Sequence, residues 1–135
     1  MRLLSKSKDG GPNSLVTAYW LVEIKSLFSI ALLKFSNGSR PVYHNHAFNS
    51  WNWVLSGLLT EDYLGAHYLM DREYRPSLWP IRTLRSTFHR VWSWGTSWVF
   101  TIRGPWSKVW SEWDPHTGEY TVLSHGRKLV TPNFR

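Results

Sequence analysis

Residues 38–57 read GSRPVYHNHAFNSWNWVLSG, and the predicted fold depends on the pattern in this stretch. Within it, His44 and His46 are separated by one residue. On a β-strand, residues two apart point to the same face, so a strand here directs both imidazoles the same way. Neutral imidazole is the commonest metal-ligating side chain. The stretch therefore predicts half of a metal site on a strand.

The composition favours a single folded domain rich in β-structure. The chain has 135 residues, 42% hydrophobic and 19% charged, which is typical of a globular protein rather than a disordered one. Its ten tryptophans favour strands. It contains no cysteine, which excludes disulfides, thiolate ligands and a cysteine nucleophile, and fits a reducing cytoplasm. Glu23 and Lys25 interrupt the one long apolar stretch, so we expect no membrane-spanning segment.

Short apolar runs separated by turn signals predict an all-β sandwich or barrel of about eight to ten strands. Residues 16–24 and 27–35 are the first predicted strand pair, although a helix over the same span remains an alternative, since such runs are ambiguous by periodicity. Residues 97–103, SWVFTIR, are a further strand. Residues 114–118 are a predicted turn with Pro115 near its start and Gly118 at its end.

The dipeptide Asn37–Gly38 is a hairpin signal, because both residues tolerate positive φ. It predicts that residues 30–36 pair with the histidine-bearing strand, which we place at residues 42–55. On that strand Ser50 shares the face of the two histidines.

Three segments are predicted from these patterns. Residues 1–14 form a flexible basic N-terminal arm, residues 15–124 form one β-barrel domain, and residues 125–135 form a basic C-terminal tail.

A metal site needs ligands from more than one strand. His89 is the natural third ligand, because it lies in a separate strand-like segment at residues 87–94. His67, His116 and His125 are interpreted as ordinary core or surface residues.

The residues around the histidine pair resemble the first motif of the cupins. That motif reads Gly, five residues, His-x-His, three or four residues, Glu, six residues, Gly. In this chain the matching positions are Gly38, His44, His46, Ser50 and Gly57. The spacing fits throughout, and Ser50 stands where the family has its Glu ligand. The second cupin motif is matched by His89 alone. The resemblance covers roughly residues 30–113, and residues 98–105 are similar to the Trp-x-Phe-x-Ile-Arg-Gly-Pro stretch of short single-domain cupins.

The resemblance implies a cupin-type double-stranded β-helix, a jelly-roll barrel. It also implies a divalent metal ion inside, Fe(II) first and Zn, Mn or Ni as alternatives. The ligand set His44, His46 and His89 is closest to three-His, cysteine-dioxygenase-like cupins. Three neutral imidazoles leave the charge of a divalent cation uncompensated, which favours a small anionic substrate.

The resemblance therefore implies a mononuclear Fe(II)-type dioxygenase acting on a small anion, with a homodimer as a further expectation. The alternative is a cupin that binds a ligand or builds an assembly without catalysis. A basic, tryptophan-rich module for single-stranded nucleic acid ranks third, on the net charge of +7.

Four further residues are candidates for the site. Glu61 could supply the missing carboxylate, because a one-residue change in hairpin register decides whether it faces inward. Arg82 and Arg90 flank His89 in the sequence and could each bind a substrate carboxylate through two hydrogen bonds. Tyr43 precedes His44 and could orient a bound ligand.

Overall fold

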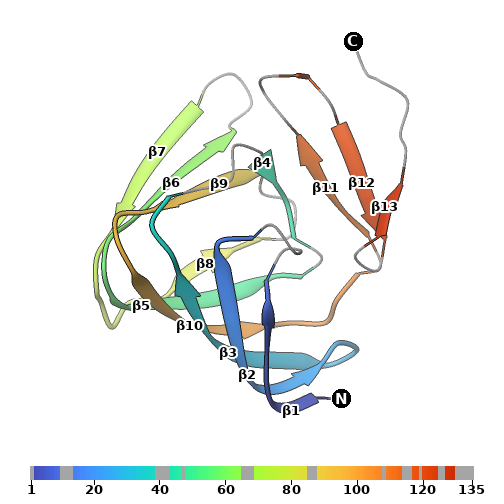
Figure 1. Ribbon diagram of the computed structural model, residues 1–135, viewed down its shortest axis with the longest axis horizontal. Coiled ribbons are helices and arrows are strands. Elements are labelled where there is room, and N and C mark those ends of the chain that lie inside the picture. The colour runs from blue at the N-terminus through green and yellow to red at the C-terminus, as the bar shows by residue number, and fades with distance from the viewer. Residues whose placement is uncertain are drawn as a thin grey trace.

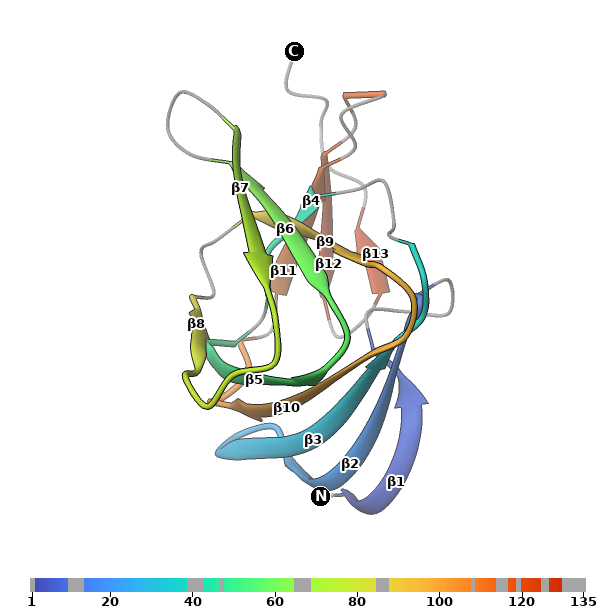
Figure 2. The same cartoon turned by 90° about the vertical axis from the view of Figure 1, so that its left-hand side faces the viewer.

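The computed structural model describes residues 2–9, 14–38, 43–46, 48–64, 69–84, 88–107, 109–113, 117–118, 120–124 and 127–129. These residues form thirteen strands in two antiparallel sheets and no helix, which confirms the all-β prediction. None of them belongs to a helix that is long and apolar enough to cross a membrane. The two sheets face each other across the interior of the molecule (Figures 1 and 2).

Across the first sheet the six strands run in the order β1 (Arg2–Lys8), β2 (Val16–Ile24), β3 (Phe28–Phe35), β10 (Ser97–Arg103), β5 (Ser50–Ser56) and β8 (Ile81–Thr83). Across the second, the seven strands run in the order β13 (Arg127–Leu129), β12 (Tyr120–Ser124), β11 (Val109–Trp113), β4 (Tyr43–His44), β9 (His89–Ser93), β6 (Leu59–Leu64) and β7 (Leu69–Tyr74).

Strand β10 shows why the first sheet forms. Its residues alternate strictly between buried and half-buried, the period expected of a strand with one face toward a core. The inward-facing Val99 packs in a cluster with Leu33, Val54 and Leu59, so residues from both sheets share one core. The predicted strand at residues 97–103 matches β10 at both ends.

The first predicted strand pair is also confirmed. Strands β2 and β3 pair in antiparallel register, with Val16 opposite Phe35 and Ile24 opposite Phe28. The amide of Leu27 donates to the carbonyl of Ile24 at 2.9 Å, which closes the turn. The helix alternative for this span is therefore wrong.

The hairpin predicted at Asn37–Gly38 is wrong. Both edges of β3 are already taken, by β2 and β10, so the chain leaves the first sheet after β3. Gly38 has a φ of 110°, as expected for a turn glycine, but it pairs with Ser93 of β9 through two backbone hydrogen bonds. The positive φ of Gly38 therefore belongs to the segment in which the chain passes from the first sheet to the second, and no hairpin forms there.

The histidine-bearing strand predicted at residues 42–55 is interrupted. Its first part is β4 in the second sheet and its later part is β5 in the first sheet. The inward face is nevertheless kept, since Phe48, Ser50 and Val54 are buried while Trp51 and Leu55 are exposed.

The two ends of the chain contain strands where an arm and a tail were predicted. Arg2–Lys8 form β1, which pairs with the outer edge of β2, and the indole of Trp20 donates to Ser7 Oγ at 2.8 Å. Arg127–Leu129 form β13, which pairs with β12. The edges of β2 and β12 each offer unpaired backbone groups, and these segments satisfy them. The domain boundaries otherwise remain a prediction, and Asp114–His116 of the predicted turn lie outside the described residues.

We expect Gly57→Ala to destabilise the protein by about 2–4 kcal/mol, because the residue has positive φ and its new Cβ meets backbone. Gly57 has a φ of 91°, and a Cβ there would lie 2.7 Å from Ser97 Cα. Gly95, with a φ of 77° and open space around it, is the matched control. Gly95→Ala should cost only about 1–2 kcal/mol. Urea unfolding of the three proteins measures the difference, and equal losses would contradict the close approach.

Candidate metal centre

Three histidines converge inside the barrel. His44 on β4 lies directly opposite His89 on β9 in the antiparallel register. His46 follows β4 and completes the group. One nitrogen from each of the three lies within 4.8 Å of the others, and the ring centroids are 4.7–5.0 Å apart.

The residue between the two motif histidines keeps both of them pointing inward. The Asn45 backbone amide donates to the carbonyl of Ser111 on β11 at 3.0 Å, and Asn45 Oδ1 accepts from the amide of Ser111 at 2.6 Å. With Asn45 tied to β11, the flanking imidazoles of His44 and His46 share the opposite side. The two imidazoles therefore point the same way, as predicted, although Asn45 and His46 are not in a strand.

Glu61 orients His89. The register of β6 on β9 places Tyr63 opposite His89 and Glu61 opposite Val91, so Glu61 and His89 are diagonal neighbours on one face. Glu61 Oε2 lies 2.6 Å from His89 Nδ1, and Tyr74 on β7 donates to Glu61 Oε1 at 2.9 Å. A carboxylate that accepts the Nδ1 proton leaves the lone pair of Nε2 directed toward the other histidines.

The charge states of these groups follow from burial and contact. Burial raises the pKa of Glu61, but the hydrogen bond and charge of His89, with further help from Tyr74 and Arg72, outweigh it and leave this pKa below its ordinary value. Burial, and then Glu61, raise the pKa of Tyr74. Burial lowers the pKa of His46, with smaller contributions from His89, His44 and Arg103. At neutral pH, Glu61 is therefore ionised and His46 is neutral.

Two of the three histidine nitrogens have the spacing of ligands around one divalent cation. His46 Nε2 and His89 Nε2 lie 3.3 Å apart. Two nitrogens bound about 2.1 Å from one ion, at angles between a right angle and the tetrahedral angle, lie roughly 3.0–3.4 Å apart. Neutral imidazoles are the ligands that Fe(II), Zn and Cu sites use, so His44, His46 and His89 could hold such an ion.

Glu61 is placed beside this group instead of within it. The three nitrogens that converge come from the histidines, and both Glu61 oxygens are engaged by His89 and Tyr74. Ser50, at the motif position of the Glu, is buried and accepts a hydrogen bond from Asn52 Nδ2 at 3.0 Å.

The arginines singled out from the sequence do not join the histidines. Arg90 points to the other face of β9 from His89 and pairs with Asp62 at 3.1 Å. Arg82 is exposed, opposite the exposed Trp51, and lies 5.5 Å above its ring. Tyr43 pairs with Trp113 through its backbone, and its side chain lies outside the described part of the structure, as do His67, His116 and His125.

Sequence reasoning missed Arg103. This arginine ends β10, is 4% exposed and faces the interior. Its guanidinium lies 4.4 Å from the ring centroid of Phe48, and Phe48 stacks on His46 at 5.1 Å. The alternation of residues 97–103 contained the signal, since Arg103 is in step with the apolar Val99.

Comparison with known proteins supports the fold. No protein-family model and no curated protein matches the sequence. A solved structure that matches over nearly the whole chain is a sugar phosphate isomerase of the cupin superfamily from Silicibacter pomeroyi. It is 11% identical with a TM-score of 0.62, and the match covers 97% of this chain and 92% of that one.

Two other solved structures match over a smaller share. Streptomyces albus HEPD, with its substrate 2-hydroxyethylphosphonate and Fe(II) bound, is 11% identical with a TM-score of 0.62, over 76% of this chain and 24% of that one. Hydroxypropylphosphonic acid epoxidase from S. wedmorenis, in complex with fosfomycin, is 14% identical with a TM-score of 0.53, over 65% of this chain and 50% of that one. The chain thus spans half or less of these two proteins. What it shares with all three is the architecture: this chain has the jelly-roll fold of the cupin superfamily, as the resemblance of its first motif predicted.

Proposed function

We propose that His44, His46 and His89 bind one divalent metal ion and that the protein is a mononuclear Fe(II)-type dioxygenase acting on a small anionic substrate. The observation that carries the proposal is the convergence of the three histidine nitrogens within 4.8 Å inside the barrel. The hydrogen bond from His89 to Glu61 supports it, because metal-ligating histidines characteristically donate their second ring nitrogen to a carboxylate or carbonyl.

Fe(II) is the favoured ion, with Zn, Mn or Ni as alternatives. Imidazole suits all of these metals, so the ligands alone do not choose among them. HEPD and the epoxidase have folds similar to that of this chain, and HEPD has Fe(II) bound. A bound Fe(II) would supply Lewis-acid and oxygen chemistry, while the chain supplies binding, orientation and charge.

A small anion is the favoured substrate class because of the charges around the site. His44, His46 and His89 contribute no negative charge when neutral, and the Glu61 carboxylate is engaged by His89 and Tyr74. Arg103 places a guanidinium in the interior, where it pairs with Asp9. HEPD acts on a phosphonate and the epoxidase is in complex with one. The likeness to cysteine-dioxygenase-like cupins is part of the same proposal.

A second candidate is a cupin that binds a ligand without catalysis. It is favoured by Ser50, which occupies the carboxylate position of the motif and is held by Asn52 and, through it, Thr83. Nucleic-acid binding ranks below both, although Trp79 and Trp94 are exposed. A homodimer and a cytoplasmic location remain predictions.

We expect wild-type protein to bind about one divalent ion per chain, and His44→Ala and His89→Ala each to lose it, because two imidazoles and water hold an ion far less tightly. Metal analysis after loading with Fe(II) under anaerobic conditions, and separately with Zn, measures the stoichiometry. Arg90→Gln is the matched control, since Arg90 neighbours His89 on β9 but faces the other way. Wild-type protein that binds neither metal would rule out the proposal.

We expect Glu61→Gln to lower metal affinity by about 10- to 100-fold, because the amide accepts less strongly than a carboxylate and leaves His89 less basic. Competition with a chelator of known affinity measures the change. Asp62→Asn, on the adjacent residue of β6, removes a carboxylate from the opposite face and should leave affinity unchanged. If the two variants lose affinity equally, the effect is one of overall charge and Glu61 has no special role.

A further inference from the structure

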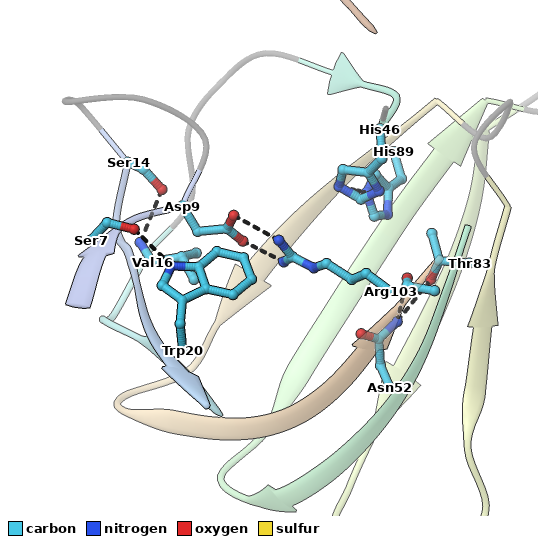
Figure 3. A network of polar contacts seen from close by, with 11 residues as sticks. Ser7, Asp9, Ser14, Val16, Trp20, His46, Asn52, Thr83, His89 and Arg103 are labelled. Carbon is cyan, nitrogen blue, oxygen red and sulfur yellow. Dashed lines mark hydrogen bonds and ion pairs between the residues drawn. The ribbon is translucent and has the colours of Figure 1, made fainter. Parts of the chain in front are cut away.

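A second charged group lies inside the barrel, on the first sheet. Arg103 makes a two-pronged ion pair with Asp9: Nη1 donates to Oδ1 at 3.0 Å and Nη2 donates to Oδ2 at 2.6 Å (Figure 3). The two residues are 94 positions apart in the chain. This fork-to-fork geometry is the one by which arginine recognises carboxylates in general.

Aromatic rings pack against the Arg103 guanidinium. The guanidinium lies between two rings, 5.3 Å from the centroid of Trp20 and 4.4 Å from that of Phe48. Its Nε is buried and has no hydrogen-bond partner among the described residues. Phe48 stacks in turn on His46, so the cation is one ring removed from the histidine group.

Asp9 is attached to the barrel at its periphery. It follows β1, an edge strand of the first sheet, which among the described residues pairs with β2 alone. The side chain of Asp9 is 22% exposed, whereas that of Arg103 is 4% exposed. Its amide donates to the carbonyl of Val16 at 2.9 Å. The Asp9 carboxylate is thus the more exposed partner of the pair.

We propose that Arg103 binds the carboxylate of a small carboxylic acid substrate, and that Asp9 holds this place until the substrate arrives. The proposal rests on the proposed function, which brings such a substrate to the neighbouring histidines. When a substrate carboxylate replaces Asp9, the guanidinium has one negatively charged partner both before and after the exchange. The exchange therefore avoids leaving a buried cation unpaired, which is the costly state.

A purely structural ion pair is the competing explanation. A buried pair contributes little net stability on average, because desolvation offsets the attraction. A structural role would be met by any anchor for β1, and the hydrogen bond from Trp20 to Ser7 already provides one. The structural explanation predicts that an external carboxylate cannot compete for Arg103.

Acetate is the probe, titrated into metal-free protein at constant ionic strength against chloride, with calorimetry and the thermal unfolding midpoint as readouts. We expect Asp9→Asn to bind acetate about tenfold more tightly than wild type, since the internal competitor loses its charge. Arg103→Gln should show no saturable binding. Arg103→Lys, which keeps the charge but not the fork, should bind more weakly than wild type and replaces Arg103→Gln if that variant does not fold.

Asp62→Asn is the matched control, because it removes a carboxylate that pairs with an arginine, Arg90, on the outer face and should create no acetate site. The inference is overturned if Asp9→Asn binds acetate no more tightly than wild type, or if Arg103→Gln binds it equally well. Metal stoichiometry of the same variants separates the two proposals. Metal binding without an acetate response removes only the role of Arg103, and an acetate response without metal binding removes only the metal centre.

Discussion

The candidate site depends on one cross-strand pair, His44 opposite His89. β4 contains only two residues, yet it pairs on one side with β11 and on the other with β9. Directly opposed residues on neighbouring strands have their Cβ atoms about 4.5–5.5 Å apart, which is close enough for two imidazoles to share one ion. His46 is brought to the same point because Asn45 is fixed to Ser111. Everything proposed about chemistry follows from this register.

Glu61 and Arg103 are buried charged residues of opposite sign with different partners. The Glu61 carboxylate serves a histidine of the group and belongs to the second sheet, whereas the Arg103 guanidinium belongs to the first sheet and is matched by Asp9. Burying a charge is costly unless it is paired and hydrogen-bonded, and both are. The histidine group therefore lies between a fixed negative charge that orients a ring and a positive charge held by a peripheral carboxylate. This arrangement is suited to an anion that must contact both the histidine side and Arg103.

Much of the fold was predictable, because the residues of several strands alternate between apolar and polar in the sequence. Strands β2, β3 and β10 were located within a residue or two from their apolar periods and turn residues. The pairing partners were less predictable. Asn37–Gly38 has the conformation of a turn, but the edges of β3 are taken by β2 and β10, and only the assembled sheet shows this. The polar segment at the N-terminus pairs as β1 because the edge of β2 is open, which is a property of the sheet and not of the segment.

The sequence by itself determined that His44 and His46 share a face, that His89 stands on another strand, and that the residues around them resemble a cupin motif with Ser50 in place of Glu. Those facts depend on spacing along one chain segment, and the period of a strand converts spacing into direction. Only the tertiary structure decided the roles of the charged residues. It placed Glu61 on His89, turned Arg82 and Arg90 away from the histidines, and brought Asp9 to Arg103. These outcomes depend on register and on contacts between distant segments, and a one-residue change in register reverses the face on which a side chain lies.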